Sequence, residues 1–516
     1  MSILTFILAF VPILLILVLM LGLRWGAVQA SLAGYLGALI IGVFYFGSGL
    51  KVLEYAHLKA FLSSLDVLLI IWAAFLFYRV TDEAGAVTNI GKALPHMTAE
   101  RGMQALVIGW GFASFLQGVG GFGVPVAVVA PILVGLGFPA IAAIIIPSVG
   151  SGWAVTFGSL GSAFQALLST TGFSSSELAL PSALFLGIAA VLTGLLVLHS
   201  AVGLGGMLRL LPAAIVLGIV MGAVQLGVAI LGPWNTAAFI GGLAGLLVSF
   251  FLARFYRGAQ TQNGKLDGKS LAVALSGYAV LIVITTVVLL VPVIKQLLGG
   301  VVIRVNIPAL TTSQGYITPA GTTKPISVFN HAGAVLFYAA LFAYLIYYLA
   351  GLYKPGSTKR ILTGTLKRVW SPSLSIILML CMATVMEFSG MTNTLAHGLA
   401  ELAGMFFPLV TPWIGAIGAF MTGSNTNSNV VFAQLQLKTA QLLGMSVAII
   451  LAGQTAGAGL ASVVAPAKIV VGTSTADLAG REGEVMRKML PYIIVLVVLV
   501  SLLTAIGAWT TFEGII

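Results

Sequence analysis

Residues 115–125 read FLQGVGGFGVP, and this stretch decides what kind of fold the chain can form. Four glycines within six positions, followed by Pro125, interrupt a helix, because glycine is conformationally free and proline lacks an N–H group. No charged residue occurs between positions 102 and 176, so the break lies in an apolar region. In a bilayer such a break must be buried in protein or line a cavity. Close helix packing also favours glycine, but it does not explain Gln117.

The composition of the whole chain is that of a membrane protein. Of its 516 residues, 7% are charged and 59% are hydrophobic, and the mean hydropathy is +1.11. Soluble proteins have about 25% charged residues, so this composition excludes a water-soluble domain, a disordered chain and a nucleic-acid-binding protein. The long apolar stretches indicate helices and not the short alternating strands of a β-barrel. We predict an all-α polytopic membrane protein with about 12–14 transmembrane helices.

The basic residues predict how the chain is oriented in the cytoplasmic membrane. The net charge is +11, and Lys and Arg concentrate in cytoplasmic loops of membrane proteins. The segments 254–269 and 352–368 contain four and five basic residues, so we place both on the cytoplasmic side. The longest loop, at about 295–333, then lies outside, as do the N-terminus and the C-terminus.

Two parts of the chain resemble each other when the sequence is shifted by about 307 positions. Gly137 then falls on Gly444, and with a shift of 305 Gly85 falls on Gly390. The polar loop of the first unit is basic and its counterpart is not, so the two units run in opposite directions. Such inverted repeats are common in secondary transporters; chance similarity of glycine-rich segments is the alternative. The predicted parts are a first repeat, connecting spans and the core of a second repeat, at residues 1–230, 231–370 and 371–516.

Residues 422–429, TGSNTNSN, form a polar break in the second unit. Polar groups without partners are unfavourable inside a membrane, but hydroxyl groups, amides and helix N-termini all donate hydrogen bonds to an anion. An extramembrane turn rich in capping residues is the alternative. The candidate binding residues of the two breaks are Gln117, Gly118, Gly120, Gly121, Ser424, Asn425, Thr426, Asn427, Ser428 and Asn429.

Other polar residues belong to the same hypothesis. Gln454 precedes Lys468, which is flanked by apolar residues and would neutralise a carboxylate unless it extends to the membrane interface. The counterpart of this segment in the first unit contains Ser159. It would either line the site with small polar groups or only allow helices to pack closely. Asp66 and Glu387 are the candidates for taking up a proton, with a headgroup-level position as the alternative that we favour for Asp66.

The sequence lacks the patterns that indicate an enzyme. It has no His/Cys cluster with metal-ligand spacing, no phosphate-binding loop and no nucleophile elbow. We therefore expect no enzymatic activity, no metal site and no cofactor.

Four segments resemble the L-lactate permease family, whose members carry lactate, glycolate and similar 2-hydroxy acids. They are FLQGVGGFGVPVAV, TGSNTNSNVVF, APAKIVV and GREGEVMRKML, which begin at residues 115, 422, 465 and 480. The resemblance extends over essentially the whole chain. It implies proton-coupled symport in a prokaryotic cytoplasmic membrane, with Ser424, Asn425 and Thr426 on the substrate carboxylate. It also implies Glu in many members where this chain has Gln117; if that Glu takes part in proton coupling, this chain uses another acid or couples differently.

The sequence thus predicts a secondary active transporter that imports L-lactate or a related small 2-hydroxy monocarboxylate by proton symport and alternating access. Sodium coupling, a sulfonate or dicarboxylate as the substrate, and an anion channel are the alternatives. The predicted partners are the organic anion and the lipid bilayer, with a homodimer left open and no nucleic acid.

Overall fold

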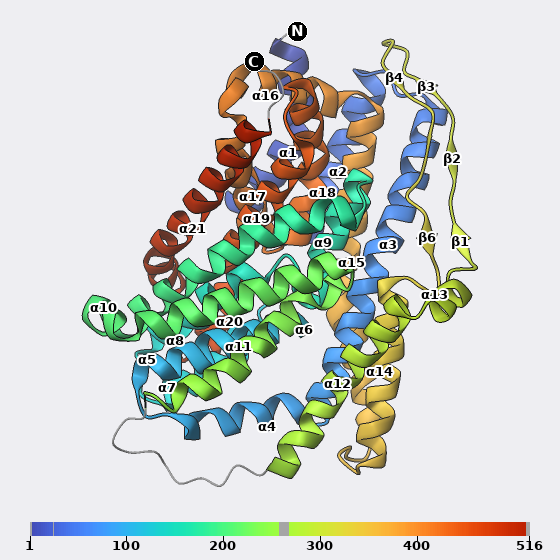
Figure 1. Cartoon of the computed structure of the whole chain (residues 1–516). Coiled ribbons are helices and arrows are strands. Elements are labelled where there is room, and N and C mark those ends of the chain that lie inside the picture. The colour runs from blue at the N-terminus through green and yellow to red at the C-terminus, as the bar shows by residue number, and fades with distance from the viewer. Residues whose placement is uncertain (1–2, 24, 257–267, 512–516) are drawn as a thin grey trace.

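The computed structural model describes residues 3–23, 25–256 and 268–511, and it is built almost entirely of helices (Figure 1). Among these residues, ten helices are long and apolar enough to cross a membrane, or up to 12 if each of two bent pairs is one span. The chain is therefore a multi-pass membrane protein. The count reaches only the lower end of the predicted range, because several predicted spans are short helices on either side of a break. Residues 257–267, most of the first basic segment, lie outside the described residues.

The helices follow in two series along the chain. Those up to residue 253 are α1 (Ile3–Leu21), α2 (Ala27–Phe44), α3 (Leu50–Glu83), α4 (Ala86–Ala93), η1 (Leu94–Met97), α5 (Arg101–Gln104), the π-helical η2 (Ala105–Phe112), α6 (Ala113–Val119), α7 (Val124–Gly135), α8 (Ala140–Ser151), η3 (Gly152–Ala154), α9 (Gly158–Thr171), α10 (Ser175–Leu231), η4 (Trp234–Thr236) and α11 (Ala237–Ala253). The second series is α12 (Gly268–Leu290), α13 (Pro292–Leu298), α14 (Ala332–Leu349), α15 (Ser357–Phe388), α16 (Met391–Ala403), η5 (Gly404–Phe406), α17 (Phe407–Thr422), α18 (Asn425–Leu442), α19 (Val447–Ala461), η6 (Ser462–Val464), α20 (Pro466–Thr475) and α21 (Glu482–Thr510).

The long helices α3 and α15 lie against each other and run in opposite directions. Near one end of the pair, Lys59 Nζ is 2.8 Å from a carboxylate oxygen of Glu387. Near the other end, Arg360 Nε donates to Glu83 Oε1 at 2.6 Å. Residue numbers therefore rise along α3 while they fall along α15.

Helix boundaries follow the shift found in the sequence. α3 and α15 begin at positions 50 and 357, and α8 and α19 begin at positions 140 and 447. The glycines that follow α3 and α15, Gly85 and Gly390, both have positive φ and both precede a new helix. Equivalent helices with opposite directions are what an inverted repeat requires; the boundaries of the three predicted parts stay a prediction.

The 57-residue helix α10 is a helical hairpin and not a single rod. Gly203 has a φ of +68° and a ψ of −175°, which ends one arm and begins the other. Gly187 in the first arm faces Gly222 in the second, where an added Cβ on Gly222 would lie 2.9 Å from the Cα of Gly187. The glycines thus let the two arms pack backbone to backbone, side by side in Figure 1.

A β-ribbon occupies most of the loop that was predicted at 295–333. It has three antiparallel pairs, with Val302 opposite Ser327, Asn306 opposite Thr322 and Leu310 opposite Thr318, so the register shifts by one residue between the first pair and the other two. The strands are β1 (Val302–Ile303), β2 (Asn306–Ile307), β3 (Leu310–Thr311), β4 (Ile317–Thr318), β5 (Gly321–Thr322) and β6 (Ile326–Ser327). The prediction of an all-α chain missed this ribbon because its pairs are two residues long and carry no strand pattern.

The ribbon tip and both ends of the chain lie at the same end of the molecule (Figure 1). Ser313 at the tip donates its N–H to the carbonyl of Gly47, just before α3. The segment between α14 and α15 lies at the opposite end; it contains Lys354, and Lys359 and Arg360 follow in the first turn of α15. This arrangement agrees with the predicted topology, whereas the side that faces the cytoplasm stays a prediction.

Candidate substrate-binding site

The predicted break in the first half is present between α6 and α7. Gly121, Phe122 and Gly123 all have positive φ, at 53°, 47° and 87°. Two of these positions suit glycine, whereas Phe122 adopts a conformation that non-glycine residues rarely accept. The helix break that was predicted from the glycines and Pro125 is therefore confirmed.

A second break in the first half separates α8 and α9, which bend by 48° with respect to each other. Ser159, Leu160 and Gly161 adopt left-handed conformations there. Two consecutive non-glycine residues with positive φ are unusual, and such strain persists only where the surrounding structure holds it.

The breaks in the second half have a less strained backbone. Gly423 ends α17 with a φ of +71°, and Ser424 then begins α18 as its N-cap, where its Oγ accepts a hydrogen bond from the N–H of Asn427 at 3.3 Å. Farther along, α19 passes through η6 to α20, whose first turn contains Lys468. The predicted break at 422–429 is thus a single turn followed by a capped helix.

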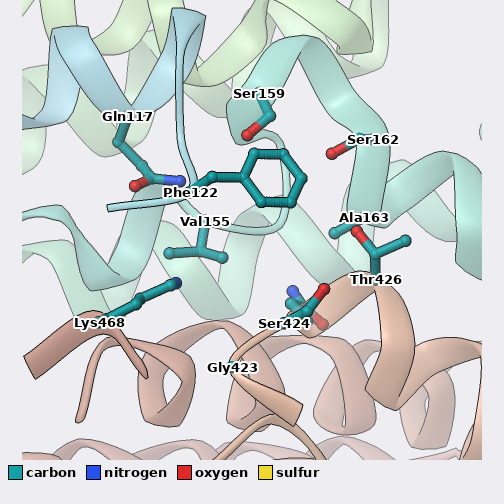
Figure 2. A pocket seen from close by; sticks show the side chains of 11 residues that line it. Gln117, Phe122, Val155, Ser159, Ser162, Ala163, Gly423, Ser424, Thr426 and Lys468 are labelled. Atoms are coloured by element: carbon teal, nitrogen blue, oxygen red, sulfur yellow. The ribbon is translucent and has the colours of Figure 1, made fainter. Parts of the chain in front are cut away.

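A cavity lies where these four breaks meet, between the two halves of the chain (Figure 2). Its volume is about 20 Å³, room for about one water molecule. Ligand pockets usually have roughly 300–1,000 Å³, so the walls of this cavity must separate to admit even a small ligand. Its lining residues are Gln117, Phe122, Val155, Ser159, Ser162, Ala163, Gly423, Ser424, Asn425, Thr426 and Lys468.

One side of the cavity is suited to a negative charge. Figure 2 shows Lys468 with its amino group pointing into the space between the halves. Its Nζ donates to Ser462 Oγ at 3.0 Å, and among the described residues it forms no ion pair with a carboxylate. Asn425 and Thr426 lie in the first turn of α18, whose N–H groups have no carbonyl partner within the helix. A cation and a helix N-terminus together favour an anion.

The opposite side combines polar and apolar groups. Gln117, Ser159 and Ser162 contribute an amide and two hydroxyl groups. Phe122 and Val155 add apolar surface, and the Phe122 ring packs on Phe75 of α3 with the ring centroids 4.9 Å apart. A molecule with a carboxylate, a hydroxyl group and a short apolar part would find a partner for each of them here.

Much of the polar segment 422–429 holds the two halves together. Asn425 Nδ2 donates to Thr156 Oγ1 at 3.0 Å and to the Thr455 carbonyl at 3.1 Å. Asn429 Nδ2 donates to the Ala163 carbonyl and to Thr455 Oγ1, each at 2.9 Å. The bonds to Thr156 and Ala163 cross from α18 to the first half, whereas those to Thr455 join α18 to α19. Asn429 lies outside the cavity lining.

The remaining predicted residues also lie away from the cavity lining. Ser428 Oγ donates to the Gly415 carbonyl at 2.8 Å, and Gln454 Nε2 reaches Ser428 Oγ at 3.2 Å. Asn427 is buried beside the capped turn of α18 and does not line the cavity. The structure therefore brings together five predicted residues, namely Gln117, Ser424, Asn425, Thr426 and Lys468.

The glycines of the first break shape the backbone and do not line the cavity. A Cβ on Gly118 would lie 2.4 Å from the Cα of Phe239, and one on Gly120 would lie 3.1 Å from the ring of Tyr78. Gly121 has positive φ and faces Ser159 closely. For Gly118, the structure therefore supports the simpler alternative, in which the glycine allows close helix packing.

Comparison with known proteins shows the family to which the chain belongs. The family model of L-lactate permease matches residues 5–510, nearly the whole chain. The chain belongs to the L-lactate permease family. An L-lactate permease of Escherichia coli K12 is 28% identical, covering 85% of this chain and 84% of its own length. The glycolate permease GlcA of the same strain is 27% identical, covering 98% and 96%.

Solved structures offer only distant similarity to this permease. The YdaH transporter of Alcanivorax borkumensis has 14% sequence identity and a TM-score of 0.46, over 86% of this chain and 85% of that one. The family assignment and the cavity therefore carry the functional argument.

Asp66, a proton-coupling candidate in this permease, lies inside the protein. Its side chain is 4% exposed, and His331 Nε2 and Lys324 Nζ approach its carboxylate at 2.8 and 3.2 Å. Partners from three other segments bury this carboxylate inside the protein, whereas its depth in the membrane stays a prediction. The sequence near Asp66 contains none of these partners.

Glu387, the other candidate, lies in a different environment. Its carboxylate pairs with Lys59 at 2.8 and 2.9 Å and accepts a hydrogen bond from Gln434 Nε2 at 3.3 Å. Its side chain is 15% exposed. This pair joins α3, α15 and α18 near the end where α16 begins.

Six lining residues of the permease were not among the predicted binding residues, namely Phe122, Val155, Ser159, Ser162, Ala163 and Gly423. Phe122 stood within the quoted break, and its place between two glycines of a turn was the available signal. Val155 and Ala163 resemble every other apolar residue of their helices, so only the fold reveals them.

Proposed function

We propose that this permease transports L-lactate or a closely related 2-hydroxy monocarboxylate, held in the cavity between the two halves. The observation that carries the proposal is the position of Lys468 beside the first turn of α18, with no carboxylate paired to it among the described residues. A half-buried cation without a counter-charge is less favourable than one that an anion joins. The curated relatives with lactate and glycolate in their names support the same substrate class.

The substrate lies across the cavity in this proposal. Its carboxylate accepts hydrogen bonds from Lys468 Nζ and from the N–H groups at the start of α18. Its 2-hydroxyl group bonds to Gln117 or to a serine hydroxyl of the opposite side. Its methyl group packs on Phe122 and Val155. A dicarboxylate fits less well, because among the described lining residues Lys468 is the one cation.

Transport follows from relative movement of the elements that form the two sides. The cavity is too narrow for the substrate as it stands, so the breaks must separate for entry and for release. We infer alternating access with a proton as the coupling ion, and import into the cytoplasm. The bonds of Asn425 and Asn429 across the halves keep the site together while it is closed.

Reconstitution into liposomes tests this proposal. Uptake of radiolabelled L-lactate is measured with an inward pH gradient, with an inward sodium gradient and with neither. We expect accumulation above the external concentration with the pH gradient, and inhibition by excess glycolate but not by a sulfonate or a dicarboxylate. Uptake that never exceeds the external concentration would indicate a channel, and accumulation driven only by sodium would refute proton symport.

The cavity itself is tested by Thr426→Ala, with Thr363→Ala on the exposed face of α15 as the matched control. Loss of the Thr426 hydroxyl should reduce lactate uptake strongly at equal expression, whereas the control should transport normally. Equal uptake by the two variants would remove Thr426 from the site.

A further inference from the structure

Asp66 is the centre of a buried polar cluster outside the substrate cavity. Three parts of the chain that are far apart in the sequence meet at its carboxylate: α3, α9, and the end of the β-ribbon with the adjacent start of α14. The contributing side chains are Gln165, Ser169, Lys324 and His331.

Every one of these partners donates a hydrogen bond to Asp66. His331 caps α14, because its Nδ1 accepts from the N–H of Gly333 at 3.1 Å. Its hydrogen therefore lies on Nε2, which faces Asp66 Oδ1 at 2.8 Å. Gln165 Nε2, Ser169 Oγ and Lys324 Nζ all approach Oδ2.

This arrangement requires an ionised carboxylate. A carboxylate has about four acceptor sites, whereas a carboxylic acid replaces one of them with an O–H donor. A proton on Asp66 would remove the counter-charge of Lys324 and direct a donor at another donor. The cluster as observed therefore corresponds to an ionised Asp66, and a protonated Asp66 would release some of these donors.

The helix α9 connects this cluster to the substrate cavity. Ser162 lines the cavity, and Gln165 and Ser169 follow at helical spacing on the same side of α9. The carbonyl of Ala163 accepts the amide of Asn429 from the second half. A change at Asp66 thus acts on the helix that forms part of the cavity wall.

Few other charged groups face the carboxylate of Asp66. The ionisable side chains that face Asp66 are Lys324 from the ribbon and His331 from α14, and α9 contributes only neutral groups. On α15, the charges with ion pairs among the described residues, Arg360 and Glu387, bond to Glu83 and Lys59 near the two ends of α3.

We propose that Asp66 is the proton-binding site that couples the pH gradient to movement of α9. A proton enters past Lys324, whose side chain is 25% exposed, and forms the neutral acid of Asp66. Gln165 and Ser169 are then released and the cavity opens; loss of the proton on the other side restores the cluster as observed. This inference rests on the proposed proton symport, and it accounts for coupling in a chain that has Gln117 where an acid was expected.

The test separates coupling from transport in reconstituted liposomes. Asp66→Asn cannot gain or lose a proton, so it should lose accumulation driven by a pH gradient but keep exchange of labelled for unlabelled lactate without a gradient. Asp82→Asn, on the same helix, is the matched control and should keep both. Failure of the wild type to transport any 2-hydroxy acid would refute the proposed function instead. Accumulation by Asp66→Asn equal to the wild type would overturn the inference.

Lys324→Met gives a second measurement if Asp66→Asn does not fold. Removing the cation beside Asp66 favours its neutral form, so the pH at which uptake is half-maximal should rise compared with the wild type. A merely structural role would lower uptake at every pH without moving this profile. An unchanged pH profile would overturn the inference.

Discussion

The two halves of the molecule break their helices by different means. In the first half, the two breaks contain six residues with positive φ, of which Phe122, Ser159 and Leu160 are not glycine. In the second half, the breaks before α18 and α20 contain one such residue, Gly423. There Ser424 is the N-cap of α18, and Lys468 in the first turn of α20 donates to Ser462 Oγ of η6.

Because of this difference, the two halves contribute different features to the site. The strained first half supplies shape, because its glycines admit close backbone packing and its turns direct Phe122 and Ser159 into the cavity. The second half supplies the charge and the free N–H groups that an anion needs. The site is therefore not symmetric between the two halves, since the sequence shift places Gly161 of the first half on Lys468.

Removing the charge of the second half should have the largest effect. Truncating one partner of a buried charged hydrogen bond costs about 2–5 kcal/mol, so Lys468→Ala should weaken lactate binding by roughly 30-fold or more. Substrate concentration dependence of uptake in liposomes measures this. Lys468→Arg keeps the charge and should retain part of the activity. Equal affinity in Lys468→Ala and the wild type would place the carboxylate elsewhere.

A pair of glycine substitutions compares the two kinds of break directly. In Gly118→Ala the new Cβ meets the backbone of Phe239 at 2.4 Å, and overpacking costs about 1–3 kcal/mol or more. In Gly423→Ala the nearest atom, the Cβ of Ala467, is 3.6 Å away, so the cost is mainly the left-handed backbone, about 1–2 kcal/mol. Thermal unfolding in detergent should show the larger loss for Gly118→Ala. The reverse order would mean that the first break adapts more easily than the second.

The sequence predicted these breaks well but predicted their contacts poorly. Glycine and proline limit the backbone locally, so the positions of the turns near Gly121 and Gly423 could be read from the chain alone. Asp66 shows the opposite case, because Gln165 and His331 lie 99 and 265 positions away from it. Which polar residues of 422–429 face a ligand and which join helices depends on such distant partners. The β-ribbon was missed for a different reason, because its strand pairs are only two residues long and leave no strand pattern in the sequence.

Asn425 tests whether the second half also holds the first in place. Its amide bonds to Thr156 and Thr455, and a buried group left without its partner costs about 1–3 kcal/mol. Asn425→Ala should therefore lower both thermal stability and lactate uptake. Asn427→Ala, two positions along the same helix and outside the cavity lining, should change either property little. A stable, inactive Asn425→Ala would instead indicate a direct role in substrate binding.

Gln117→Glu should have the smallest effect, and one that depends on pH. Gln117 lies on the side of the cavity opposite Lys468. An ionised Glu there would attract Lys468 and repel the substrate carboxylate, while a protonated Glu would resemble the native amide in shape. Lactate affinity of Gln117→Glu should therefore approach that of the wild type in acid and fall below it as the pH rises. Lactate affinity in liposomes over a series of pH values measures this, with the wild type as the reference. An affinity that stays at the wild-type value at every pH would show that position 117 does not sense the charge of the substrate, and the polar side of the cavity would then consist of the serines of α9.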